Sequence, residues 1–461
     1  MKISRRDAHC NTYALPRLRF EAQQLTSYAG LVLIQKLMAL LNLKRRLFAC
    51  LAHLSDGQTF TPARVFLQLL LHLMLGFRDL REVVFYRHDP LIKRLLGLRE
   101  LPDAATLSRQ LRRLDERGIE RLRELMRSLV LHWLARLALV RVTIDFDGFV
   151  QSTARKAEGT AIGYNPKKKG RRSYYPLVAS IAQTQQVLDF LHRSGNVHDS
   201  RGARDFIIAC VRHVRAMLPH AVIEVRMDGA FFSDEIVKAL HGMGVEFTIS
   251  VPFERFPALK QIIEDRHWWY GIDQGRWGFD RRWKPRRWSR QHRFVFVCVE
   301  KDVPEKGPLQ LDLFEPVDRQ YEYKVIVTNK DVGLGAVTRF HDGRGQQENL
   351  FGQMSTHCHT QHVPVRHRRG NEAYLMAGCM AQNLLRELQM RTQPRQRATN
   401  ASRTPLWAFL NPQTWRQRWL NRAGRLTRPA GELTLTISGD EQIEEIFTEM
   451  LDQMQEEREA A

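Results

Sequence analysis

Alternating hydrophobic and polar residues predict the first strand of this chain at 140–147. Val, Val, Ile and Phe alternate there with Arg, Thr and two Asp, the period of two that a strand shows. Residues 200–217 have helical spacing instead. Further strands are predicted at 175–182, 186–192, 222–227, 245–251, 293–299 and 321–328. Strands that then alternate with helices predict a mixed α/β domain with helices packed against the sheet.

The first part of the chain has a helical pattern. Within 28–137, Leu and Arg are frequent and apolar residues recur three and four positions apart, as at Phe66, Leu70 and Leu73, which predicts amphipathic helices. Asp103 is a suitable N-cap for a following helix that carries three arginines. A DNA-binding helix has this pattern, and an ordinary basic surface helix has it too.

The composition points to a polyanionic partner. The 461 residues include 71 Lys and Arg against 50 Asp and Glu, which gives a formal charge of +21 and a sequence pI near 10.1. Since no run of 18 apolar residues and no signal-peptide pattern is present, nucleic acid is favoured over a membrane as that partner. The six cysteines are scattered without paired spacing and are expected to be reduced thiols in a cytoplasmic protein.

Changes of pattern along the chain predict its division into parts. A helix is predicted at 371–390, an Arg-rich linker at 391–404, a strand at 433–437 and an acidic amphipathic helix at 440–461. The parts are a helical N-terminal DNA-binding region (1–138), the first part of an α/β core (139–252), a β-rich insertion rich in Arg and Trp (253–320), the second part of the core with Glu348 (321–392) and a C-terminal region with the acidic helix (393–461).

Three carboxylates that are distant in sequence are candidates for one metal site. Asp147 and Asp228 each end a predicted strand, and Glu348 lies in a predicted helix. Like charges held close repel one another, so such a cluster requires divalent cations. Asp145 and Asp147 point to the same face of a strand, so the pattern alone does not choose between them. We prefer Asp147, because Gly148 lets the backbone turn after it; an aspartate that only caps a turn is the alternative.

The chain resembles the DDE transposases of bacterial insertion sequences, in the insertion-sequence-four superfamily and its branch numbered 1380. An ordered set of motifs carries the resemblance over about residues 25–390: Asp147-Gly, Gly-Tyr-Asn-Pro-Lys-Lys from 163, Ser-Tyr-Tyr-Pro-Leu from 173, Gly-Asn-Val-His-Asp-Ser from 195 and Arg-Met-Asp-Gly-Ala-Phe-Phe from 226. The family's helix signature is Tyr-x2-Arg-x3-Glu-x6-Lys, and the corresponding residues here are His341, Arg344, Glu348 and Ser355. Two of the four signature positions match.

The resemblance implies an RNase H-like catalytic core with a β-rich insertion between Asp228 and Glu348. It implies that Asp147, Asp228 and Glu348 are catalytic and hold two Mg²⁺ ions, for which Mn²⁺ substitutes, with Asp147 shared by both ions. Water would be the first nucleophile and the freed 3′-hydroxyl of the element the second. His341 and Ser355 depart from the Tyr and Lys that are thought to contact DNA in the family.

Further residues are candidates for DNA contacts. Arg344 lies on the same helix face as Glu348, and a basic loop follows Asp147. The loop comprises Lys167, Lys168, Lys169, Arg171 and Arg172, and a solvated hairpin tip is its alternative interpretation. Residues 266–293 hold nine Arg or Lys and five Trp with only two acids. In this segment Trp268, Trp269 and Trp283 are candidates to stack on bases, and hydrophobic core is their alternative role.

The sequence therefore predicts a transposase that cleaves the ends of an insertion sequence and transfers them into target DNA. The expected partners are double-stranded DNA with terminal inverted repeats, target DNA and a second copy of the chain. The protein is expected in the bacterial cytoplasm, associated with the nucleoid. A related DDE nuclease, or an inactive transposase remnant that only binds DNA, is the alternative.

Overall fold

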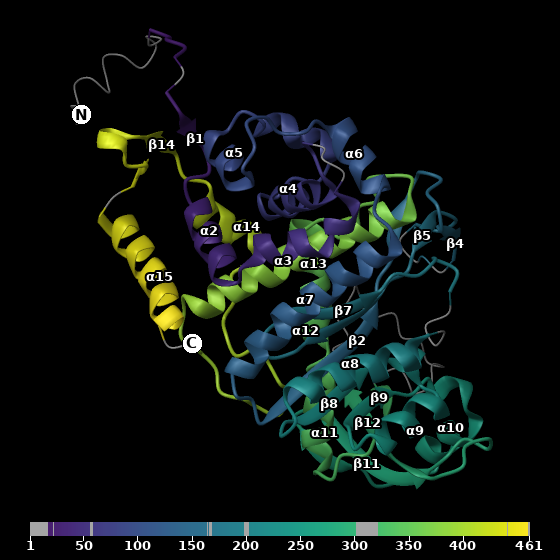
Figure 1. Cartoon of the computed structure of the whole chain (residues 1–461). Helices are drawn as coiled ribbons and strands as arrows, with labels where there is room; N and C mark the ends of the chain where they lie inside the picture. The colour runs from purple at the N-terminus through teal and green to yellow at the C-terminus, as the bar shows by residue number, and fades with distance from the viewer. Residues whose placement is uncertain are drawn as a thin grey trace, which may run out of the picture.

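The computed structural model describes residues 17–21, 23–55, 59–163, 165, 168–197, 202–300, 321–439 and 441–459. Within them, a large mixed β-sheet lies beside a group of mainly N-terminal helices, and a long helix, α13 (Arg368–Arg391), runs between the two parts (Figure 1). The protein is thus a mixed α/β structure, as the alternation of predicted strands and helices indicates.

Nine strands of the described residues form the large sheet in the order β10-β11-β12-β13-β9-β8-β2-β6-β7. Strands β2, β8 and β9 are parallel to one another, and the other neighbouring pairs are antiparallel. The strands are β2 (Arg141–Gly148), β6 (Leu177–Ile181), β7 (Gln186–Leu191), β8 (Val222–Met227), β9 (Glu246–Ser250), β10 (Tyr270–Asp273), β11 (Arg276–Trp283), β12 (His292–Glu300) and β13 (Tyr321–Thr328). The strand predictions at 140–147, 186–192, 222–227, 245–251, 293–299 and 321–328 are confirmed.

The two faces of this sheet differ in character. On one face Val142, Ile144 and Phe146 of β2 are buried with apolar residues of α8 (Ala203–Met217) and α9 (Asp234–Gly242). On the other, the polar face, Thr143 and Asp145 of β2 lie beside Glu224 and Arg226 of β8, and these four side chains are also buried. Two helices cover the polar face, α11 (Leu334–Asp342) and α12 (Gly345–His357). The polar residues that alternate with apolar ones in β2 and β8 therefore lie on a second buried face of the sheet and not on a solvent-exposed one.

Residues 253–320 were predicted to form a β-rich insertion. Their described strands, β10 to β12, continue the large sheet, because β12 pairs with β13 along its length. Phe294 and Phe296 of β12 are buried with the α8 and α9 side, whereas Val295 and Val297 are buried with Val337 of α11. Burial on both faces is typical of a strand inside a sheet.

The N-terminal helices and α13 (Arg368–Arg391) share one hydrophobic core. The helices of this region are α2 (Leu31–Leu40), α3 (Leu43–Cys50), α4 (Pro62–Met74), α5 (Pro90–Leu96), α6 (Ala104–Arg112) and α7 (Glu116–Arg136). Nearly all of α13 is buried, and its polar residues have partners: Asn383 exchanges hydrogen bonds with the backbone of Val187, and Glu387 pairs with Arg391. The predicted N-cap is confirmed, since Asp103 accepts from the N–H of Thr106.

Residues 392–411, which we call the C-terminal segment, lie against the polar face rather than forming a free linker. The N–H of Leu406 donates to the Gln183 carbonyl at 2.9 Å, and the side chains of Leu406 and Trp407 are buried. Arg403 donates two hydrogen bonds to the Glu224 carboxylate, at 2.8 and 2.9 Å. The C-terminal segment therefore covers part of the polar face of the sheet.

Among the described residues, the remaining strands and α-helices before the last helix form two small sheets and two short helices. Two small sheets are formed by β3 (Gln151–Thr153), β5 (Arg172–Tyr174) and β4 (Ala161–Ile162), and by β1 (Leu25–Thr26), β14 (Gly424–Thr427) and β15 (Thr434–Ile437). The short helices are α10 (Pro257–Glu264) and α14 (Pro412–Trp415).

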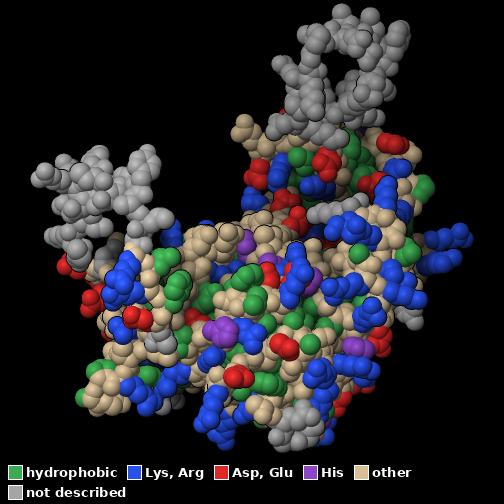
Figure 2. Space-filling view, turned by 90° about the horizontal axis from the view of Figure 1, so that it is seen from above, with side chains coloured by type: hydrophobic (Ala, Val, Ile, Leu, Met, Phe, Trp, Pro, Cys, Tyr) green, Lys and Arg blue, Asp and Glu red, His purple; other side chains and the backbone are tan. Residues whose placement is uncertain are grey.

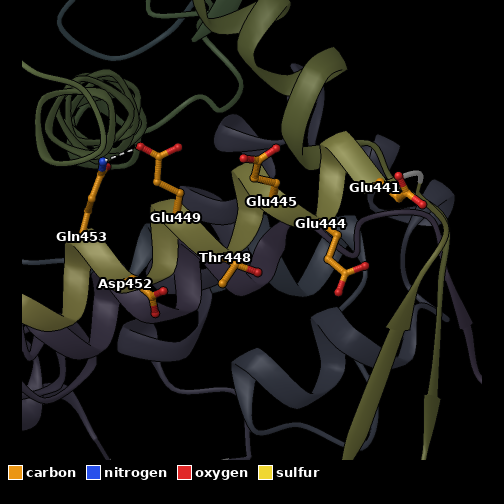
Figure 3. Close-up of a pocket in the computed structure, with 7 residues that line it drawn as sticks. All are labelled: Glu441, Glu444, Glu445, Thr448, Glu449, Asp452 and Gln453. Carbon is orange, nitrogen blue, oxygen red and sulfur yellow. Dashed lines mark hydrogen bonds between the residues drawn. The ribbon is translucent and has the colours of Figure 1, made fainter.

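The predicted acidic amphipathic helix is α15 (Glu441–Glu459). It buries Phe447, Met450 and Met454 in the core shared with the N-terminal helices. Five of its acidic residues, Glu441, Glu444, Glu445, Glu449 and Asp452, are exposed along one side of the helix, where Gln453 donates to Glu449 at 3.0 Å (Figure 3).

Candidate active site

Asp147 and Asp228 lie side by side at the carboxyl ends of adjacent parallel strands. The register pairs Phe146 of β2 with Met227 of β8, and each aspartate follows its paired residue directly. Both are only partly buried, although the five residues before each, 142–146 and 223–227, are buried. Asp147 accepts from the N–H of Gly148 at 2.7 Å, and Asp228 accepts from the N–H of Ala230 at 3.0 Å. Turns after both strands therefore place two carboxylates at one edge of the sheet.

Asp145, the alternative to Asp147, is part of the buried structure. Its carboxylate accepts from Nε and Nη2 of Arg226, at 2.5 and 2.8 Å. Burial raises the pKa of the Asp145 carboxyl, and the Arg226 charge acts in the opposite direction. Because both Asp145 oxygens are engaged below the surface, Asp147 is the residue of this pair that borders solvent.

Glu348 lies in the first turn of α12 with an exposed side chain. Arg344 connects it with Asp147: Nη1 lies 3.1 Å from the Asp147 carboxylate, and Nη2 lies 3.7 Å from that of Glu348. In the described part of the chain no three His, Cys, Asp or Glu side chains converge closely enough to hold a metal ion as they stand. The positive charge next to Asp147 and Glu348 in this structure is the Arg344 guanidinium, which contacts both carboxylates.

The donor set nevertheless suits a divalent ion. Hard carboxylate oxygens at the ends of two adjacent strands, with a third carboxylate on the neighbouring helix, are the ligands that Mg²⁺ and Mn²⁺ take, with water and substrate phosphate completing the shell. The partial exposure of Asp147 and Asp228 leaves room for those further ligands.

His341 does not lie on the surface with Glu348. It is buried on α11, where its ring nitrogens lie 2.8 Å from the Ser250 hydroxyl and 3.0 Å from the Thr248 hydroxyl. Burial, together with the charges of Arg344 and Arg226, lowers its pKa to about 3. His341 is therefore a neutral side chain that joins α11 to β9, and both of its nitrogens are used within the protein.

Ser355 and the basic loop lie along a cleft beside Asp147. This cleft, of about 850 Å³, is lined by Gly148, Tyr175, Lys168 and Ser355 among others. The N–H of Lys168 donates to the Asn165 side chain, and the side chains of Lys168, Lys169 and Arg171 are exposed. Arg172 instead donates to Thr160. Lys167 lies outside the described residues.

The three candidate tryptophans differ in their surroundings. Trp268 is 82% exposed. Trp269 packs edge-on against Phe279 at 4.7 Å, and Trp283 packs against Phe294 at 5.0 Å. Trp268 is thus accessible to a base, while the other two belong largely to the hydrophobic core.

Reasoning from the sequence assigned no role to Arg226 and Gln347. Both donate hydrogen bonds to Asp145, beneath the three proposed catalytic acids. Gln347 donates to the Asp145 carbonyl at 2.9 Å, and Arg226 holds the Asp145 carboxylate. Arg226 and Glu224, two charged residues that alternate with apolar ones in β8, were the available signal. Lys and Arg side chains are spread over the face seen in Figure 2, with acidic side chains between them.

The sequence profile of the family described as "Transposase DDE domain group 1" matches residues 13–459. The chain therefore belongs to this family of DDE transposases. No curated protein matches it.

Solved structures resemble it at low identity. A piggyBac transposase synaptic complex with hairpin DNA is 11% identical, with 78% of this chain and 74% of that chain covered and a TM-score of 0.42. The Mos1 transposase paired-end complex with the left transposon end is 11% identical (42% and 59% covered, TM-score 0.18), and the Mos1 mariner paired-end complex with Mn is 12% identical (42% and 60% covered, TM-score 0.18). In the described residues no helix is long and apolar enough to span a bilayer.

Proposed function

We propose that this protein cleaves the ends of a bacterial insertion sequence and joins them to target DNA, with Asp147, Asp228 and Glu348 as its catalytic carboxylates. The observation that supports this most is that Asp147 and Asp228 directly follow Phe146 and Met227, the last residues paired between two parallel strands. Glu348 stands on the helix that covers the same face, within reach of the arginine that contacts Asp147.

The strand order supports an RNase H-like core. Three consecutive antiparallel partners, β7, β6 and β2, are followed by β8 and β9 in parallel. The core would span 139–252 and 321–392, the N-terminal region 1–138 would bind DNA, and β10 to β12 would extend the core. The insertion-sequence-four superfamily, in its branch numbered 1380, is the assignment that the motifs support.

Asp147 would hold two Mg²⁺ or Mn²⁺ ions, with Asp228 and Glu348 holding one each. Such ions, when bound, activate the attacking oxygen and stabilise the leaving oxygen of a phosphodiester. Asp147 must first release Arg344, because one carboxylate oxygen now contacts that guanidinium. Once released, Arg344 has a free planar fork, which suits a DNA phosphate near the cleaved bond.

Exposed cations and Trp268 supply the other proposed DNA contacts. Lys168 lines the cleft beside Asp147 and Lys169, next to it, is exposed; both would neutralise phosphates. Trp268 would stack on an unpaired base. The active complex is proposed to hold two element ends and target DNA with two copies of the chain, on the bacterial nucleoid.

The test is cleavage of a duplex that carries the element's end. Asp147→Asn, Asp228→Asn and Glu348→Gln should each abolish Mg²⁺-dependent nicking, whereas Glu445→Gln on exposed α15 should leave it unchanged. Cleavage by all three site variants at the normal rate would remove the carboxylates from the mechanism.

A second assay separates a transposase from the alternatives. The full chain should join a pre-cut 3′ end to target DNA. Cleavage without joining would indicate a DDE nuclease, and binding without cleavage would indicate an inactive remnant; the burial of His341 and the loss of a lysine at Ser355 are the observations that favour these two.

A further inference from the structure

Each proposed catalytic acid has a buried polar residue one or two positions before it in the sequence. Asp145 stands two residues before Asp147, Arg226 two residues before Asp228, and Gln347 one residue before Glu348. All three are at most 2% exposed, and we call them the buried polar cluster.

The members of the buried polar cluster bind one another. Arg226 donates to both Asp145 oxygens, at 2.5 and 2.8 Å, which joins β8 to β2. Gln347 donates to the backbone carbonyl of Asp145 at 2.9 Å and to the Ser180 hydroxyl at 3.0 Å, which joins α12 to β2 and β6. The three chain segments that carry the acids are therefore linked directly below the site.

Arg226 also contacts the turn that leads into α12. Its Nη1 donates to the carbonyls of Phe340 and Ser402, at 3.0 and 2.8 Å, and its guanidinium lies 5.2 Å from the Phe340 ring. A Cβ added at Gly343 would stand 2.2 Å from that nitrogen and 1.9 Å from the Ser402 carbonyl oxygen. The backbone two residues before Gly345 thus rests on the guanidinium, with no room for a side chain.

We propose that Arg226 is a positioning residue that sets the spacing of the three catalytic carboxylates; this inference rests on the proposed function. Arg226 is fully buried, so it touches neither DNA nor metal and acts through the backbones of β2, β8 and the α11–α12 turn. A metal site tolerates errors of only about 0.5 Å in its ligands. Four donated hydrogen bonds from one planar group supply that constraint, and the point charge of a lysine does not.

Arg226→Lys is the variant that tests this, and Arg403→Lys is its matched control. Arg403 makes the same two-point contact with a buried carboxylate, Glu224, on the same strand but toward its other end. Mn²⁺ binding to the full chain on a duplex of the element's end is followed by electron paramagnetic resonance. Unfolding temperature, kcat and KM are measured on the same proteins.

We expect Arg226→Lys to weaken Asp147-dependent Mn²⁺ binding by about 10- to 100-fold, the range found when outer partners of metal ligands are changed. Its kcat should fall while KM for the DNA end stays unchanged. Arg403→Lys should lower the unfolding temperature without changing Mn²⁺ affinity. Equal Mn²⁺ affinity and kcat in Arg226→Lys and wild type would overturn the positioning role.

A further variant covers the case in which Arg226→Lys does not fold. Gln347→Met removes only the link from α12 to β2 and β6, and it should weaken Mn²⁺ binding by a smaller factor; wild-type affinity in this variant would then overturn the proposal. Asp147→Asn distinguishes the two levels of inference. If Mn²⁺ binding by the wild type does not depend on Asp147, the proposed function fails together with the positioning role.

Discussion

Replacing Arg344 by Gln should make the candidate metal site bind divalent cations more tightly while it becomes a poorer enzyme. The Arg344 guanidinium lies 3.1 Å from Asp147 and 3.7 Å from Glu348. A cation that enters between these carboxylates must break the contacts and then tolerate a neighbouring positive charge. Gln keeps much of the side chain's length and removes the charge.

The expected size of the effect follows from exposure. The side chains of Arg344 and Asp147 are 21% and 17% exposed, and that of Glu348 is 68% exposed. Solvent-screened pairs of this kind contribute about 0.2–1 kcal/mol each. The Asp147 contact belongs in the upper part of that range and the longer Glu348 contact in the lower part. Together they amount to about 1 kcal/mol, or roughly a fivefold gain in affinity.

The assay is a Mn²⁺ titration of the full chain, followed by electron paramagnetic resonance at two ionic strengths. Arg339→Gln is the control, because Arg339 makes a comparable exposed pair with Asp273 at 3.0 Å away from the three acids. The gain for Arg344→Gln should shrink at higher salt, since the pairs it removes are screened. An unchanged or weaker Mn²⁺ affinity in this variant would refute competition between the guanidinium and the metal.

Three further predictions concern stability and DNA binding. Trp268→Ala should weaken binding to the element's end in a gel-shift assay with little change in unfolding temperature, whereas Trp283→Ala should cost about 2–4 kcal/mol because its ring is packed. Burial lowers the pKa of His341 in the folded protein to about 3. As the pH falls below about 6.5, His341 therefore takes up a proton in the unfolded chain before it does so in the folded one. Stability is then lost toward pH 3 by up to about 1.4 kcal/mol per unit, and urea unfolding at pH 7 and 5 should show a smaller loss for His341→Asn. Gly148→Ala would bring a Cβ to 2.7 Å from the Tyr175 ring and should cost about 1–3 kcal/mol in the same assay, most of which Tyr175→Ser restores.

The sequence was sufficient for the strands because their pattern is local. Residues 140–147 alternate in character, and β2 occupies nearly the same range. The same alternation was ambiguous about Asp145, since a polar position in a strand is ordinarily solvent-facing. Here it faces Arg226, which lies 81 residues away in sequence. A buried polar face is visible only once the partner strand is known.

The surroundings of the candidate site depended even more on distant partners. The signature register placed His341 near Glu348, but its hydroxyl partners, Thr248 and Ser250, come from β9. Likewise, Trp283 is packed because β11 pairs with β12 and brings Phe294 beneath it. From the sequence, residues such as His341 and Trp283 could either contact DNA or belong to the buried core. Their packing against distant strands decides between these two roles.

The contacts of the C-terminal segment have a consequence for when the candidate site is completed during synthesis of the chain. The Ser402 carbonyl accepts a hydrogen bond from Arg226, so the proposed support beneath Asp147, Asp228 and Glu348 includes a residue that is translated after all three of them. A nascent chain that has exposed Glu348 but still holds residue 402 in the ribosomal exit tunnel would carry all three proposed catalytic carboxylates without this contact to Arg226. If the proposed function and the positioning role of Arg226 hold, a chain that ends before residue 402 should therefore cleave DNA less efficiently than the full chain.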